Sequence, residues 1–238
     1  MKKLLILLIF SVSLTSYSQD ITTSNWFFGD LTIYNSSDFY EAETLGRYSY
    51  TEEEKRNIRK KQYLYKEYLP AQVDQYRKGA LLRYNLYNDE MEFSKDGVIF
   101  YLKKEAGRTV RFTESKELYK VYKLGDELKF MKVMVEGDYS LLVKESKKFV
   151  PPKKRRTTYG HHIKATFKRK KDISYLKLSN GKLVEIPSKK ADFFNLFGKE
   201  ANSVKAYMKK NKLGFKKAAD LKKVVTYLNS WSNKVQKG

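Results

Sequence analysis

The sequence predicts an α+β protein in which an antiparallel β-rich body is followed by about three C-terminal helices. Apolar and polar residues alternate with a period of two over most of residues 71–186. After residue 187 the apolar residues recur at helical spacing instead, so strands precede helices along the chain. Because the strands are short and separated by turn residues, the body is expected to be a sandwich, a barrel or a strongly curved sheet.

The first 18 residues have the organisation of a cleavable export signal. Lys2 and Lys3 form a charged start, an apolar run covers residues 4–14, and small residues precede a cut after Ser18. The apolar run is about half of the ~20 residues that a spanning helix needs, which favours excision over an uncleaved anchor. We therefore expect a mature chain that begins at Gln19 and is periplasmic, envelope-associated or secreted.

Composition narrows the class of exported protein further. The chain has no Cys, so it folds without disulfides and has no cysteine for lipid attachment. No second long apolar run follows the signal, so at most a peripheral attachment to a membrane is expected. Hydrophobic residues make up 41% and aromatic residues 15% of the chain, enough to bury a core rather than leave it disordered.

Aromatic runs and one capping motif organise the residues before the β-rich body. The runs at 25–29 and 31–34 predict one or two strands. Thr51 and Glu54 then form a capping box, in which the threonine hydroxyl accepts the amide of the glutamate. A helix of about three turns is expected from this point, with two lysines at 60–61 near its C-terminal end.

Turn residues divide the β-rich body into short strands. We expect turns at 94–97, 105–107, 125–126, 136–138 and 179–182. The turn at 136–138 joins residues 128–135 to residues 139–143 and predicts a hairpin. Further strands are expected at 163–167, 173–178 and 183–186.

Three helices are expected to end the chain. Ser188 caps the first, Phe193 lies on its apolar face, and Gly198 is a natural C′ residue. The second covers about 202–211 and the third about 216–231. The predicted organisation is a signal peptide at 1–18, a β-rich domain at 19–186 and a helical subdomain at 187–238.

Positive charge is concentrated in the C-terminal part of the chain. Residues 19–146 contain 21 basic and 22 acidic residues, whereas residues 147–238 contain 26 and 5. The densest stretch, 147–171, has 11 basic residues and no acid, and like-charge repulsion together with two prolines predicts a solvated loop at 147–160. This stretch is either a solubilising surface or a surface for an anionic partner. The candidate binding residues are Lys153, Lys154, Arg155, Arg156, Lys168, Arg169, Lys170 and Lys171.

Residue types for catalysis are scarce. The two histidines, His161 and His162, are adjacent, so on a strand they point to opposite faces and cannot serve one site. There is no Cys nucleophile, no Gly-x-Ser-x-Gly elbow and no glycine-rich phosphate loop. The sequence therefore predicts no catalytic residues and no cofactor.

The best acidic cluster consists of Asp89, Glu90 and Glu92. On a strand Glu90 and Glu92 share a face, which allows a weak oxygen-ligated Ca²⁺ site. The alternative is that these are solvent-facing carboxylates that alternate with core residues Met91 and Phe93, and this alternative needs no ligand. The sequence therefore predicts no metal site here.

Aromatic residues leave two further alternatives open. The 19 tyrosines either line a concavity for sugar or lipid, or are favoured strand residues. Basic residues interleaved with aromatics at 159–175 are typical of nucleic-acid binding, but export makes this partner unexpected. Anionic lipid or polysaccharide of the cell envelope is the expected partner.

Two segments resemble parts of uncharacterised exported bacterial proteins. They are LRYNLYNDEMEF at 82–93 and VKAYMKKNKL at 204–213, the second followed by Asp220-Leu221. The resemblance implies export and common ancestry but no activity.

The predicted function is that of a non-enzymatic envelope or secreted protein, a scaffold or binding module whose basic C-terminal part faces anionic surfaces. The alternative is a hydrolase or transferase acting on envelope carbohydrate or lipid, because paired catalytic carboxylates may be remote in sequence.

Overall fold

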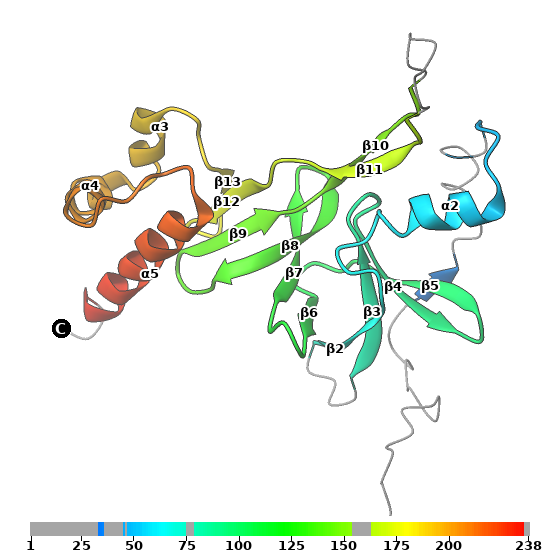
Figure 1. Ribbon diagram of the computed structural model, residues 1–238. Helices are drawn as coiled ribbons and strands as arrows, with labels where there is room; N and C mark the ends of the chain where they lie inside the picture. Colours follow the sequence, from blue (N-terminus) through cyan, green and yellow to red (C-terminus); the bar gives the residue numbers. More distant parts are fainter. Residues whose placement is uncertain (1–32, 36–44, 46, 75–78, 154–162, 236–238) are drawn as a thin grey trace, which may run out of the picture.

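The α+β class is confirmed by the structure, in which a large antiparallel sheet is followed by C-terminal helices (Figure 1). The computed structural model describes residues 33–35, 45, 47–74, 79–153 and 163–235, with side chains except at 33–35 and 231–235. The predicted export signal at 1–18 and the predicted strand at 25–29 lie outside these residues. No helix in the described ranges is long and apolar enough to cross a membrane.

The main sheet is 11-stranded, in the order β1-β5-β4-β3-β2-β6-β7-β8-β9-β12-β13, and its strand pairs are antiparallel. Its strands are β1 (Ile33–Asn35), β2 (Leu69–Val73), β3 (Ala80–Asn85), β4 (Glu90–Lys95), β5 (Val98–Leu102), β6 (Thr109–Phe112), β7 (Leu118–Leu124), β8 (Glu127–Val135), β9 (Ser140–Lys144), β12 (Ile173–Lys177) and β13 (Leu183–Glu185). The predicted hairpin around 136–138 is confirmed as the β8–β9 pair.

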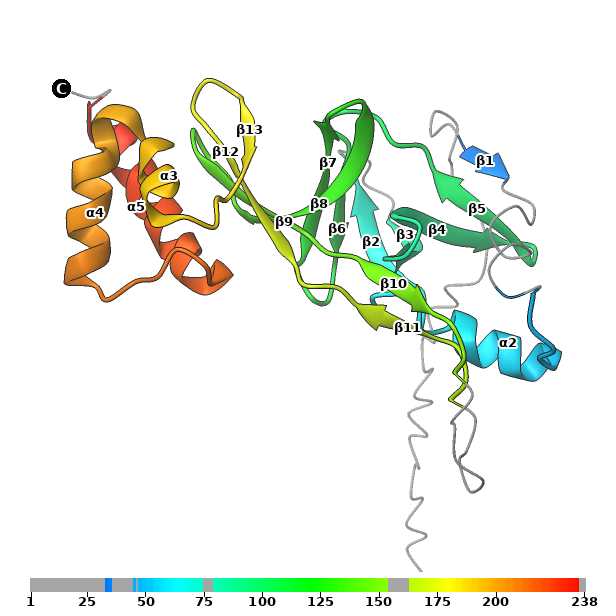
Figure 2. The same ribbon diagram turned by 90° about the horizontal axis from the view of Figure 1, so that it is seen from above.

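The sheet is curved, so that its two sides approach each other. Strands β3, β4 and β5 follow one another on one side of β2, and strands β6 to β9 follow one another on the other side. The two sides curl toward each other (Figure 2). The ring of Tyr84 on β3 lies with its centroid 5.0 Å from that of Tyr119 on β7 and 5.9 Å from that of Phe130 on β8. The main core therefore lies inside the curl, where apolar side chains of β2 to β8 meet.

Helix α2 (Glu52–Arg59) begins at the predicted capping box. The Thr51 hydroxyl accepts the Glu54 amide at 3.2 Å, and the Glu54 carboxylate accepts the Thr51 amide at 3.1 Å. At eight residues the helix is shorter than the three turns predicted. It ends there because the chain turns to bury Gln62, whose carbonyl accepts the amide of Leu86 beyond β3 at 3.1 Å.

Strands β10 (Lys147–Val150) and β11 (Thr166–Arg169) form a separate two-stranded arm that continues from β9 and β12. The prediction of a loop at 147–160 is thus wrong for residues 147–150, while residues 154–160 lie outside the described part of the chain. Phe149 and Phe167 are directly paired across the arm and pack with Ile58 of α2. The gain from burying these apolar side chains outweighs the repulsion between the lysines beside them.

The C-terminal helices are α3 (Lys190–Asn195), η1 (Gly198–Glu200), α4 (Ala201–Lys210) and α5 (Ala218–Val235). The predicted Ser188 cap is wrong, because the N-cap is Lys189 and its side chain makes no capping hydrogen bond. Gly198 has a positive φ of 49°, but lies two residues beyond the C-cap Leu196 rather than one. The helices bury Phe193, Val204 and Leu228 in a second core that also includes residues of β9 and β12.

Candidate functional site

The basic arm presents two faces with different surroundings. Cross-strand partners share a face, and successive residues alternate between faces. The inner face therefore carries the Phe149–Phe167 pair and the neighbouring Lys147–Arg169 pair, which pack toward α2 and the sheet. The outer face carries Lys148 directly opposite Lys168, and both side chains are exposed.

The inner-face cations of the arm are engaged within the molecule. Lys147 donates to the carbonyl oxygens of Lys61 at 2.8 Å and Tyr63 at 2.5 Å, and burial lowers its pKa. Arg169 donates to Glu145 at 2.5 Å and forms an ion pair with Asp172 at 3.0 Å. These two residues hold the arm in place through contacts within the molecule.

Glu145 joins the arm to the main core. Its second carboxylate oxygen accepts the hydroxyl of Tyr119 on β7, and only 6% of the Glu145 residue is exposed. Burial and the adjacent carboxylate raise the pKa of Tyr119, so its hydroxyl stays protonated and remains a donor. The chain Tyr119–Glu145–Arg169 thus fixes the direction in which the arm leaves the sheet.

The outer-face cations have no such partners. Among the described residues, no carboxylate lies within ion-pair distance of Lys148, Lys168, Lys170 or Lys171, and all four are exposed. We call these four residues the arm lysines. Directly opposed like charges destabilise a strand pair, so the Lys148–Lys168 pair is a local cost within the fold.

The eight predicted binding residues fall into three groups. Lys153, Lys168, Lys170 and Lys171 are exposed on or beside the arm, and Lys153 pairs with Ile163 in an isolated bridge. Arg169 is exposed as well, but it is held by two carboxylates. Lys154, Arg155 and Arg156 lie outside the described residues. Lys148 was missed, although its alternation with Phe149 was a strand signal in the sequence.

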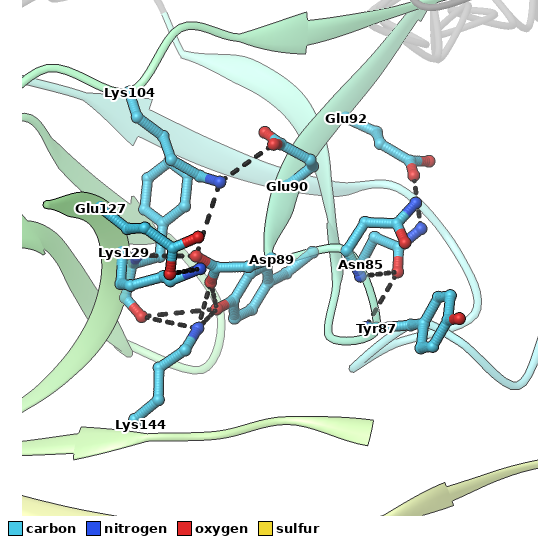
Figure 3. A network of polar contacts seen from close by, with 12 residues as sticks. Asn85, Tyr87, Asp89, Glu90, Glu92, Lys104, Glu127, Lys129 and Lys144 are labelled. Carbon is cyan, nitrogen blue, oxygen red and sulfur yellow. Dashed lines mark hydrogen bonds and ion pairs between the residues drawn. The ribbon is translucent and has the colours of Figure 1, made fainter. Parts of the chain in front are cut away.

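The acidic segment forms a buried network of ion pairs (Figure 3). Asp89, 7% exposed, accepts the Tyr84 hydroxyl at 2.6 Å and the Lys144 ammonium, and lies 3.5 Å from the ammonium of Lys104. Its other oxygen accepts the amide of Phe130 at 3.4 Å. Burial lowers the pKa of Lys144. Asp89 therefore joins the β3–β4 turn to β8 and β9, which lie on the other side of β2 in the sheet order.

Glu92 lies in a second buried network on the other side of β4. It receives hydrogen bonds from Arg83 at 3.0 Å and Asn85 at 2.9 Å, and burial raises its pKa. The Arg83 guanidinium also lies 3.5 Å from the centroid of the Tyr63 ring and 4.3 Å from that of Tyr68. The prediction that these carboxylates face solvent is wrong for Asp89, which β8 and β9 cover, and for Glu92, which residues 62–68 cover.

This arrangement is suited to holding the fold together rather than to binding a cation. The described carboxylates of the segment are already paired with ammonium or guanidinium groups. Within the described ranges no group of three or more His, Cys, Asp or Glu side chains is placed to hold a metal ion. His161 and His162 lie outside those ranges. The largest fully buried tyrosines, Tyr84 and Tyr119, pack in the core and do not line a concavity.

Comparison with protein-family models, curated proteins and solved structures finds no match for this chain. The resemblance to exported bacterial proteins therefore stays a prediction from the sequence.

Proposed function

We propose that this is a non-enzymatic exported protein that attaches reversibly to anionic surfaces of the cell envelope through its arm lysines. The single observation that carries the proposal is the exposed Lys148–Lys168 pair, two like charges opposed across a strand pair without a carboxylate partner. An external polyanion placed between them would relieve their repulsion. A merely solubilising surface does not need the two charges to be directly opposed.

Exposed lysines without an ion pair also occur in the curved sheet, but Lys95 lies opposite Val98 and Lys123 opposite Leu128, not opposite another lysine. Other lysines of the curved sheet form ion pairs with carboxylates, for example Lys104 with Glu90 at 2.9 Å and Lys120 with Glu136 at 3.0 Å. Around the arm, Glu145 and Asp172 hold Arg169, and Glu54 of α2 pairs with Lys164 at 2.7 Å. The arm lysines are thus left with positive charge that is free for an external partner.

Export is part of the same proposal and has its own test. The charged start, short apolar run and small residues before Gln19 support cleavage after Ser18. We expect mass spectrometry of the protein from its native envelope to show Gln19 as the first residue, with or without cyclisation to pyroglutamate. Recovery of an intact 1–18 segment in the mature protein would contradict it.

Co-sedimentation tests the binding function. The variant replaces the four arm lysines with Gln, and its matched control replaces four exposed lysines of the neutral part, Lys66, Lys95, Lys116 and Lys123. Each Lys or Arg near an anionic bilayer contributes about 1 kcal/mol, so loss of the arm lysines should weaken binding at least about tenfold.

The salt dependence separates specific attachment from other binding. The wild type and the control should sediment with phosphatidylglycerol vesicles or with an anionic polysaccharide at low salt, and dissociate at about 1 M salt, where the Debye length is only about 3 Å. Equal binding by the arm variant and its control, or no binding by the wild type at low salt, would show that the arm lysines are only a solubilising surface.

A further inference from the structure

The helical subdomain carries a second concentration of unpaired positive charge. Residues 187–238 contain 13 lysines and three acidic residues, Asp192, Glu200 and Asp220. Asp220 accepts the backbone amide of Gly214 at 3.0 Å, which uses one of its carboxylate oxygens within the helical hairpin. None of the ion pairs among the described side chains involves a lysine of this subdomain. The lysines of residues 189–223, the described part of this set, are therefore exposed and without internal compensation.

The lysines of α4 and those at 222–223 of α5 lie on faces turned away from the core. Helix α4 buries Val204 and Met208, and α5 buries Leu221, Val224, Val225 and Leu228. Lys205 and Lys209, one helical turn apart on α4, are exposed, as are Lys222 and Lys223 on α5. We call these four residues the helix lysines.

The arm lysines and the helix lysines lie at opposite ends of the same pair of strands. Strand β9 begins at Ser140, next to Tyr139, whose backbone binds Asn229 of α5, and ends at Lys144, from which the chain enters the arm. Strand β12 leaves the arm at Ile173 and runs back toward the helices. At ~3.4 Å per residue these five-residue strands alone separate the two ends by about 17 Å. Figures 1 and 2 both show the arm and the helices at separate ends of β9 and β12.

From this placement we infer that the protein has two independent anion-binding surfaces and bridges two anionic lipid bilayers, one held by the arm lysines and the other by the helix lysines. The inference rests on the proposed function and adds to it a second surface and a cross-linking role. Neither surface is a site for one small ligand, since lysine ammonium groups are hydrated point charges without the fixed fork of arginine. They suit a field of mobile phosphate headgroups.

One apolar side chain favours a bilayer over a soluble polymer. Ile163 is 48% exposed, the highest value among the large hydrophobic residues whose exposure the structure describes, and it lies opposite Lys153 at the far end of the described arm. An exposed apolar side chain beside lysines is the combination that binds at the headgroup boundary of anionic membranes. A dissolved polysaccharide would gain nothing from it.

Vesicle clustering tests the inference. The full-length mature protein is mixed with vesicles of phosphatidylcholine containing phosphatidylglycerol, in lipid excess and at low salt, and light scattering is followed together with co-sedimentation. Three variants are compared with the wild type, each with four lysines replaced by Gln: the arm lysines, the helix lysines, and the control set Lys66, Lys95, Lys116 and Lys123. Circular dichroism checks that each variant is folded.

We expect the wild type and the control variant to cluster the vesicles and to release them at high salt. Each single-surface variant should still sediment with vesicles, with affinity lowered about tenfold or more, but should not cluster them, because it keeps one binding surface. A soluble polyanion added as a competitor should displace the wild type from the vesicles only in part.

The outcomes separate the inference from the function on which it rests. If the wild type does not bind vesicles at low salt, the proposed attachment to anionic lipid is wrong. If it then precipitates a soluble anionic polysaccharide, the partner is a polysaccharide and not a bilayer. If the wild type binds without clustering, the bridging role is wrong and attachment stands. If both single-surface variants still cluster vesicles, the cross-link comes from self-association of the protein and not from two surfaces.

Discussion

Asn229 of α5 binds the β8–β9 turn through both the oxygen and the nitrogen of its side-chain amide. Its oxygen accepts the amide of Tyr139 and its nitrogen donates to the carbonyl of the same residue, both at 2.9 Å. The amide fits there because Gly137 has no side chain. A Cβ added at Gly137 would lie 2.5 Å from the Asn229 nitrogen. One glycine in the sheet and one asparagine in a helix are therefore matched across the interface.

We expect Gly137→Ala to lower the free energy of unfolding by about 1–3 kcal/mol, because the new methyl group displaces the Asn229 amide from Tyr139. Urea unfolding measures this cost. In an Asn229→Ala background the same Gly137→Ala change should cost clearly less, since the clash is gone. Equal costs in both backgrounds would mean that the effect does not pass through Asn229.

Asp89 joins the β3–β4 turn to β8 and β9 through charged and polar contacts. Asp89→Asn keeps the shape of the side chain and tolerates the left-handed backbone (φ 62°), but it removes the counter-charge of buried Lys144. We expect a loss of about 3 kcal/mol or more in the free energy of unfolding. Adding Lys144→Met should restore part of it. The control is Glu127→Gln, whose exposed pair with Lys129 should contribute little to stability.

At the scale of elements, Glu117 ties the β6–β7 turn to two other parts of the body. It binds the Lys132 ammonium of β8 and accepts the hydroxyl of Tyr65, in the segment before β2, at 2.7 Å. Burial alone would raise its pKa, but these hydrogen bonds outweigh burial and lower the pKa below its model-compound value of 4.5. The ionised carboxylate is thus the form that the fold prefers.

This gives the fold a defined pH dependence. Because the folded pKa of Glu117 is depressed, its contribution to stability is present above pH ~4.5 and is lost as pH falls through the folded pKa. We expect Glu117→Gln to lower the free energy of unfolding by about 1 kcal/mol at pH 7 and by less at pH 3. Urea titrations at the two pH values measure the difference. Glu114→Gln, exposed on the same turn, should have little effect at either pH, and a cost for Glu117→Gln that does not shrink on acidification would refute the linkage.

Patterns among neighbouring residues predicted the helices and strands well, but they predicted poorly which polar side chains are buried. The Thr51 capping box, the β8–β9 hairpin and the apolar stripe of α5 depend on nearby residues, so the sequence was enough to find them. Burial of Glu92 depends on residues 62–68, which arrive from elsewhere in the chain and turn an apparent solvent face into an interior.

The candidate site shows the same division between local and long-range causes. Charge counting found the basic stretch but could not separate Arg169, which Glu145 and Asp172 neutralise, from Lys168, one residue away. It also missed the pairing of Lys148 with Lys168, because strand register depends on the packing of Phe149 and Phe167 against α2.

At the scale of the whole molecule, the predicted boundary at residue 187 does not separate two cores. The second core joins Leu141 of β9 and Leu176 of β12 to Val224 and Leu228 of α5, and each of these side chains is at most 1% exposed. Strands β9 and β12 belong at the same time to the main sheet. The helices are therefore part of the β-rich body energetically, although they follow it in sequence.

Leu228→Ala should for this reason destabilise the sheet as well as the helices. We expect a loss of about 2–5 kcal/mol, from the apolar transfer of the side chain and the cavity left at its site. Unfolding should remain a single transition, with faster hydrogen exchange of the β9 and β12 amides as well as those of α5, because the shared core couples them. Thr226→Ala, exposed on the same helix, serves as the control and should leave exchange in the sheet unchanged. If Leu228→Ala accelerates exchange in α5 alone, or splits the unfolding curve into two transitions, the helical subdomain is an independent unit, and the fixed separation of the arm lysines from the helix lysines would no longer hold.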